Sequence, residues 1–188
     1  MAALLVGAAD GGAPVRGDRA AVLTFLKAHD SPVAAEWRAL GPGVDDALAA
    51  IAADTKVDAP LRARALGALG LLPTRRSRDF LGQFVKQNAA ASAPADMSLL
   101  RKAALSLGWV GGPEAVEILG PLLEHADAEV RLDAAIALGL TRSRDAALWL
   151  RPRFDAEKDP HVRTQIGRQL RTVEAAEASR AATASDTK

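Results

Sequence analysis

One thirteen-residue frame recurs along the chain, and it constrains the fold more than any other feature of the sequence. The frame reads DAPLRARALGALG from Asp58, DMSLLRKAALSLG from Asp96, DAEVRLDAAIALG from Asp127 and DPHVRTQIGRQLR from Asp159. In all four copies, aliphatic residues stand three, seven and eleven positions after the aspartate. A step of four residues places these side chains on one face of a helix. Each copy therefore predicts an amphipathic helix with a buried aliphatic stripe.

The two ends of the frame have the character of helix boundaries. The leading aspartate suits an N-cap, because its carboxylate can accept hydrogen bonds from the backbone N–H groups of the first turn. Three of the copies close on a glycine, Gly70, Gly108 or Gly139, where a residue in the left-handed conformation would end a helix. We therefore expect each frame to be one complete helix.

A second apolar segment follows each of the first three full frames. These segments read RDFLGQFVKQ from Arg78, PEAVEILGPLLEH from Pro113 and RDAALWLRPRF from Arg144. A fainter copy runs from Asp30 through Trp37 to Gly41 and is followed by VDDALAAIAAD from Val44. Helix pairs repeating at this interval predict an α-solenoid, in which each unit buries its apolar face against its neighbours.

The repeated frame resembles the HEAT-like repeat of the phycobilisome-lyase type, whose units begin D-x-x-V-R and continue A-x-x-A-L-G. The resemblance covers about residues 30 to 173 and implies an all-α fold, a right-handed α-solenoid of about five HEAT-like helix pairs. It also implies a stacking role for the paired aspartates and arginines, which are Asp58 with Arg62, Asp127 with Arg131, and Asp159 with Arg163. In the copy from Asp96, Leu100 stands where the arginine would be, so an arginine ladder would be interrupted there.

Composition agrees with one helical domain and sets its boundaries. Alanine and leucine supply most of the apolar residues, whereas aromatic residues make up 4% of the chain. We expect the solenoid over 17–175, with a helix at 17–30 covering its first pair. Residues 1–16 are interpreted as a disordered start or an export-signal remnant, and 176–188 as a polar disordered tail. The compartment stays open: cytoplasmic, or exported to the periplasm if residues 1–9 are such a remnant.

The sequence offers no set of residues for catalysis, a metal or a cofactor. There is no cysteine, and the three histidines, His29, His125 and His161, lie close to repeat boundaries. Glu129 stands four residues after His125 and Glu157 four before His161, but each pair spans the aspartate that begins a frame, so neither forms a metal pair within one predicted helix. No serine stands in a nucleophile motif. GWVGGPE from Gly108 lacks the lysine and hydroxyl residue of a phosphate loop, so we interpret it as an inter-helix turn. We expect neither a cofactor nor an enzyme.

After this search two classes of function remain, protein binding and nucleic-acid binding, and a third, a lyase-type enzyme, has less support. The leading hypothesis is a non-enzymatic adaptor or scaffold that binds another protein, one with acidic patches, on the ridge of its second helices. The predicted partner-binding residues are basic and form two clusters: Arg75, Arg76, Arg78 and Lys86, and Arg142, Arg144, Arg151 and Arg153. The alternative is nucleic-acid binding, although Glu114, Glu117 and Glu124 interrupt a continuous phosphate track.

A HEAT-like lyase-type enzyme is the weaker class, because no residue identifies its site. The tryptophans Trp37, Trp109 and Trp149 are spread over different units, which favours packing over an aromatic cage. No segment approaches the roughly 20 apolar residues of a membrane helix, so we expect no membrane insertion. The sequence leaves the oligomeric state open.

Overall fold

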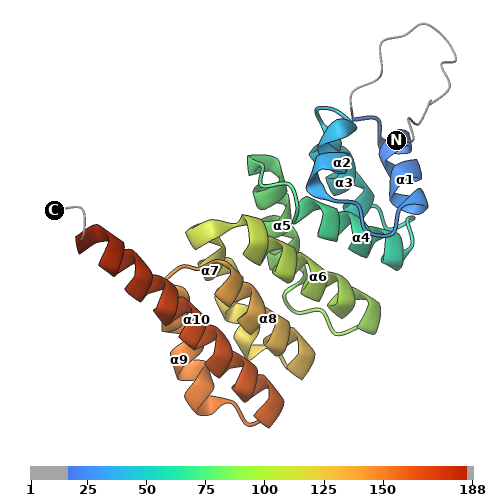
Figure 1. The fold of residues 1–188 in the computed structure, drawn as a ribbon. Coiled ribbons are helices and arrows are strands. Elements are labelled where there is room, and N and C mark those ends of the chain that lie inside the picture. Colours follow the sequence, from blue (N-terminus) through green and yellow to red (C-terminus); the bar gives the residue numbers. More distant parts are fainter. Residues whose placement is uncertain (1–16, 186–188) are drawn as a thin grey trace, which may run out of the picture.

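The chain forms a row of stacked helix pairs, an all-α solenoid (Figure 1). The computed structural model describes residues 17–185, and the regular secondary structure in this range is helical. The expected start at 1–16 lies outside the described residues. In chain order the elements are α1 (Arg19–Ala28), α2 (Ala34–Ala39), α3 (Val44–Ala53), α4 (Ala59–Leu69), α5 (Arg75–Asn88), α6 (Pro94–Val110), the 3₁₀ turn η1 (Gly112–Ala115), α7 (Val116–Leu119), the 3₁₀ turn η2 (Gly120–Glu124), α8 (Ala128–Leu140), α9 (Ala146–Ala156) and α10 (Pro160–Ser185).

The helices form two layers. The repeated frames supply the first helices α4, α6, α8 and α10, each of which packs against the next. The second layer contains α3, α5, the η1–α7–η2 segment and α9. α1 packs on α3 and contacts α4, as expected of a covering helix. None of the described helices combines the length and the hydropathy that a membrane span requires.

The predicted aliphatic stripe forms the core between the layers. The middle position of the frame is fully buried in every copy, as Ala65, Ala103, Ala134 and Ile166. The positions four residues to either side are buried too, except that Leu61 and Leu170 remain partly exposed and pack against the core. The four-residue period therefore identified the buried face of the first helices.

Three of the five leading aspartates cap helices as predicted. Asp58 accepts from the Leu61 N–H at 2.9 Å, Asp127 from the Val130 N–H at 3.0 Å, and Asp159 from the His161 N–H at 2.8 Å. Asp18, which precedes the covering helix, accepts from the Ala20 N–H in the same way. These carboxylates satisfy backbone donors that have no partner within the helix.

The other two aspartates are not caps, so that part of the prediction is wrong. α6 begins at Pro94, and Asp96 therefore lies inside its first turn. Proline is favoured at the first helical position, which moves the start of α6 ahead of the aspartate. α2 begins at Ala34, and there the Glu36 carboxylate accepts from the Val33 N–H, so Asp30 has no capping role.

The glycines that close the frame do not end the helices in a left-handed conformation. Gly70 is the C-cap of α4 but has φ −66°, whereas Gly108 and Gly139 lie inside α6 and α8. They allow first helices to approach closely instead. A Cβ on Gly108 would lie 2.5 Å from the backbone oxygen of Ala137 in α8. Glycine is needed here because the neighbouring first helices leave no room for a side chain between them.

The same relation holds at the other two glycines. A Cβ on Gly70 would lie 2.9 Å from the Ser106 side chain in α6, and one on Gly139 would overlap the Gln169 side chain in α10. Each glycine of the frame thus faces the first helix of the following unit. The glycine recurs in the sequence because the same close contact recurs between successive units.

The third unit and the last helix differ from their expected forms. The segment from Pro113 is not one helix but η1, α7 and η2. Gly120 and Pro121 break it, because proline supplies no N–H, and the ring of Trp149 packs where a Cβ of Gly120 would stand. α10 continues to Ser185, so the helix extends past the boundary expected at residue 175.

Candidate functional site

Ion pairs between units occupy many of the charged residues of the frame. Arg101 follows Leu100, the leucine that was expected to interrupt the arginine ladder. Its guanidinium lies 2.6 Å from Asp133 and 3.0 Å from Glu129, both in α8. Burial raises the pKa of the Asp133 carboxyl, and the hydrogen bond from Arg101 opposes that shift. An arginine therefore still couples this unit to the next one, but it stands one position later in the frame than expected.

Glu157 is the centre of a second and deeper network. Its carboxylate is 4% exposed and accepts from Arg131 at 2.9 Å and from Arg153 at 2.8 Å. The backbone N–H of Asp159 donates to it at 2.9 Å. Burial alone would raise the pKa of Glu157, but these hydrogen bonds outweigh it and lower the pKa from 4.5 to about 2. This carboxylate joins α8, α9 and the start of α10.

Two of the three histidines, His29 and His125, have side chains in structural positions, whereas His161 is exposed. Asp127 N–H donates to Nδ1 of His125 at 3.0 Å, so Nε2 of His125 carries the proton and donates to the Ala91 carbonyl at 3.0 Å. His29 stacks on Phe25, and its Nδ1 lies 3.1 Å from the Phe25 carbonyl. Among the residues that the structure describes, no group of three or more potential ligand side chains is placed to hold a metal ion.

The tryptophans follow the packing prediction in two cases out of three. Trp37 is buried and meets Phe25 edge to face at 5.0 Å between ring centroids, and Trp149 packs against Gly120. Trp109, near the end of α6, is 66% exposed, so the packing prediction is wrong there. A step of two residues turns a helix by about 200°, so Trp109 points away from the face on which Leu107 is buried.

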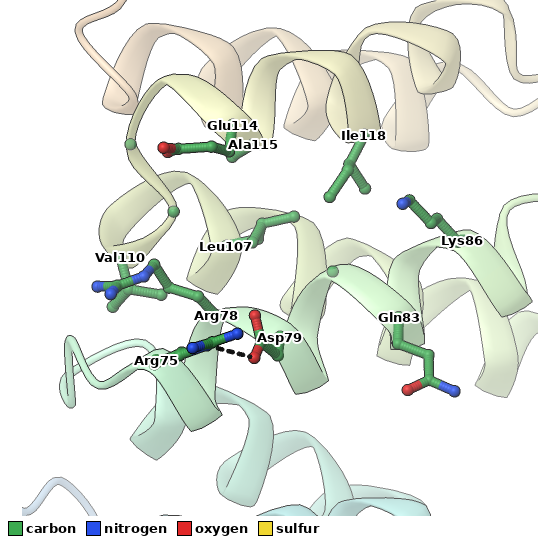
Figure 2. A pocket seen from close by; sticks show the side chains of 13 residues that line it. Arg75, Arg78, Asp79, Gln83, Lys86, Leu107, Val110, Glu114, Ala115 and Ile118 are labelled. Atoms are coloured by element: carbon green, nitrogen blue, oxygen red, sulfur yellow. Dashed lines mark ion pairs between the residues drawn. The ribbon is translucent and has the colours of Figure 1, made fainter.

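A groove of about 810 Å³ lies between α5 and the η1–α7 segment, with the end of α6 as its floor (Figure 2). One wall consists of residues from α5: Arg75, Arg78, Asp79, Gly82, Gln83 and Lys86. The floor and the opposite wall are largely apolar: Leu107, Val110, Gly111, Gly112, Ala115 and Ile118, together with Glu114. The groove is partly open to solvent, so a segment of chain could enter it from outside.

The charges of the groove are unevenly distributed. Arg75 lies 3.5 Å from Asp79, one helical turn further along α5. Arg78 donates to the Pro73 carbonyl, and neither Arg78 nor Lys86 forms an ion pair with any described residue. Glu114 stands on the other side of the groove, as Figure 2 shows. The wall formed by α5 is therefore the cationic one.

The structure separates the predicted basic clusters and divides the first. Arg75, Arg78 and Lys86 line the groove, whereas Arg76 pairs with Asp46 of α3 at 2.6 Å. The second cluster lies at the other side of the η1–α7–η2 segment, on and just before α9. The two clusters do not form one site.

Within the second cluster, ion pairs occupy most of the side chains. Arg153 joins the Glu157 network and also pairs with Glu124 at 2.9 Å. Arg151 pairs with Glu174, and Arg144 lies 3.7 Å from Asp145. Arg142 has a positive φ of 51°, and its carbonyl accepts from Arg180. These contacts give Arg151 and Arg153 roles in holding α9 to its neighbours.

Sequence reasoning missed the apolar part of the groove and its glycine. Leu107 was assigned to the stripe of a first helix and Val110 to the inter-helix turn, whereas Val110 ends α6 and both residues border the groove floor. Gly82 is buried, and a Cβ there would lie 3.0 Å from Ile118. The spacing of Arg78, Gly82 and Lys86, four residues apart, is the signal that could have identified this wall.

Comparison with known proteins agrees with the repeat. Residues 88–171 match the family model for HEAT repeats, a segment that runs from the end of α5 into α10. Together with the stacked helix pairs, this match supports a HEAT-like repeat protein. The phycobilisome-lyase type is not confirmed, and no curated protein matches the chain. HEAT repeats are generally protein-interaction scaffolds and are typically non-enzymatic.

Proposed function

We propose that this protein is a non-enzymatic adaptor, which binds another protein in the groove between α5 and the η1–α7 segment. The observation that carries the proposal is the lining of that groove. It combines a cationic wall with an apolar floor, and its cations Arg78 and Lys86 are not used in ion pairs with the described part of the chain. A solenoid offers such a surface without a deep pocket.

The distribution of charge supports a protein partner over a nucleic acid. A nucleic acid presents a regular series of phosphates and needs a continuous cationic track. Here Glu114 and Glu117 are exposed on the η1–α7 segment, between the two basic clusters. Arg151 and Arg153 are held in ion pairs. One short cationic wall favours a partner with a local acidic patch.

Affinity capture from a nuclease-treated lysate of the source organism, read by mass spectrometry, tests the proposal. The bait is the full chain, and the test variant carries Arg78→Glu and Lys86→Glu. The control carries Lys56→Glu and Arg168→Glu, which make the same change of charge at exposed positions outside the groove. We expect a protein that the wild type and the control retain and the test variant loses.

Two results would contradict the adaptor function. One is retention of the same proteins by the wild type and by both variants. The other is capture of nucleic acid alone from untreated lysate, with a yield that falls steeply as salt is raised.

A further inference from the structure

We infer that the groove binds an extended peptide segment that has acidic residues at positions i and i+4 and aliphatic residues at the positions i+1 and i+3 between them. This inference rests on the proposed adaptor function and names the chemistry of the partner segment. Three features of the groove carry it: the spacing of its two cations, the apolar surface opposite them, and the carboxylate on the far wall.

The cations available to a ligand are Arg78 and Lys86. Arg75 lies 3.5 Å from Asp79, so this pair largely neutralises itself. Arg78 and Lys86 are eight residues apart on α5, which corresponds to about 12 Å along the helix axis at 1.5 Å per residue. Both line the groove, and the helix turns by little more than a fifth of a circle between them.

An extended peptide that runs along α5 matches this spacing. Its residues rise by about 3.3 Å each, and alternate side chains point to the same side. Residues i and i+4 then present their side chains on one side about 13 Å apart. Carboxylates at these two positions can therefore meet Arg78 and Lys86 at the same time. Gly82 stands between the two cations, and Ile118 of the opposite wall lies 3.0 Å from where its Cβ would be, so residue i+2 must be small.

The same geometry directs the intervening residues to the apolar surface. Side chains at i+1 and i+3 point away from α5, toward the groove floor and the opposite wall. On that surface Ile118 is partly exposed and provides the main apolar contact, while Leu107, Val110 and Ala115 are nearly buried and add only their edges. Burial of aliphatic side chains there supplies the affinity, while the two carboxylates fix the register of the peptide.

Glu114 sets the direction in which the acidic residues must face. It lies on the wall opposite α5 and forms no ion pair with the described residues. A peptide carboxylate directed toward it would be repelled, and so would a ligand with negative charge on both sides. The groove therefore selects a segment that is acidic on one side and aliphatic on the other.

Fluorescence anisotropy with labelled, terminally blocked pentapeptides tests this inference on the full chain. The probe is DLALD, which carries the acidic residues at i and i+4. NLALN removes both charges, and DLDAL has the same composition with the acidic residues two positions apart. The protein variants are Arg78→Glu and Lys86→Glu, with Arg168→Glu as the matched control at an exposed residue of α10. Circular dichroism melts confirm that each variant is folded.

We expect DLALD to bind with a dissociation constant below about 1 mM, and each groove variant to weaken it about tenfold, a change of 1.4 kcal/mol. NLALN and DLDAL should bind at least tenfold more weakly than DLALD, and Arg168→Glu should leave its affinity unchanged. Equal affinity for DLALD and DLDAL would overturn the spacing argument. Equal loss in Arg168→Glu would show nonspecific charge attraction and would also overturn the inference, as would no binding of DLALD.

The peptide experiment and the capture experiment can fail separately. If capture depends on Arg78 and Lys86 but DLALD does not bind, the adaptor function stands and the extended acidic segment is wrong. If the capture experiment yields no dependent protein and DLALD still binds with the expected pattern, the groove chemistry stands without the adaptor function.

Discussion

The two halves of the solenoid are held together by different interactions. From α6 to α10, buried charges join the helices. Arg101 reaches Asp133 in the next unit, and Glu157 at the end of α9 accepts from both Arg131 of α8 and Arg153 of α9. From α1 to α5, each ion pair between described elements has at least one clearly exposed side chain. The Arg76 and Asp46 side chains, for example, are 54% and 65% exposed. In that half, packing of the apolar core holds neighbouring units together.

This difference shows that the half of the solenoid from α6 to α10 tolerates less change in the arrangement of its helices than the half before it. A buried charge is tolerated only in the presence of its partners, so the network around Glu157 requires α8, α9 and α10 in one arrangement. An exposed pair contributes about 0 to 1 kcal/mol, so a change in its geometry alters the energy little. The HEAT-repeat match covers residues 88–171, which is the half with the buried network. The half before it has the short helix α2 and the shorter frame.

The largest effect should follow loss of the shared carboxylate. Glu157→Ala removes the buried carboxylate that Arg131 and Arg153 share, and the side chains of these arginines are 12% and 16% exposed. Among the described residues, Arg153 keeps only the exposed Glu124 as an ion-pair partner. Breaking a buried ion pair by removal of one partner costs about 3 to 5 kcal/mol. We expect a decrease of this size in the free energy of unfolding, measured by urea denaturation.

The matched control in the other half is Asp46→Ala. It removes the partner of Arg76 at the surface, where an ion pair contributes about 0 to 1 kcal/mol. If the two substitutions lower the free energy of unfolding by equal amounts, the contrast between the halves does not hold.

Acid should act on the same network with a smaller effect. The pKa of Glu157 is about 2 in the folded protein against 4.5 ordinarily. The stabilisation is therefore complete above pH 4.5 and is lost as the pH falls toward 2, a change of about 3 kcal/mol. Asp133 acts in the opposite direction because its pKa is raised, so its carboxyl takes up a proton earlier in the folded state.

The measurement is the unfolding free energy of the wild type and of Glu157→Gln from pH 7 to pH 2. The wild type should lose about 3 kcal/mol more than the variant over the acid range. Parallel curves for the two proteins would mean that Glu157 is not protected from protonation by its arginines.

The sequence was sufficient to predict the helix pairs, the stripe and three of the caps, because those features depend on local periodicity. It could not show that Gly108 and Gly139 lie inside helices, since a close contact with the next unit and a helix end both require glycine. It also could not show the fracture of the segment from Pro113. The glycine and proline at 120 and 121 were visible in the sequence, but the packing of the Trp149 ring against Gly120, from the following unit, was not.

Part of the candidate site could also be predicted, because it depends on the local positions of residues within one helix. Arg75, Arg78 and Lys86 could be identified as a cationic cluster from their positions in a second helix. The partners that remove Arg76, Arg151 and Arg153 from such a surface are distant in sequence: Asp46, Glu174 and Glu124. Only the stacking of units reveals which cations remain available, and which apolar residues lie opposite them.

The smallest predicted effects concern glycine, and they have opposite signs in the two halves. Gly108→Ala places a Cβ 2.5 Å from a backbone oxygen of Ala137, which cannot move without shifting α8. Overpacking of this kind costs about 1 to 3 kcal/mol. Gly67→Ala in α4 meets nothing closer than the Lys102 Cδ at 3.7 Å. An alanine there should stabilise the helix by about 0.5 to 1 kcal/mol, because glycine loses more backbone entropy on folding. Urea denaturation of both variants compares the two positions directly, and a gain of stability in Gly108→Ala would show that the first helices are not packed at their limit in the half after α5.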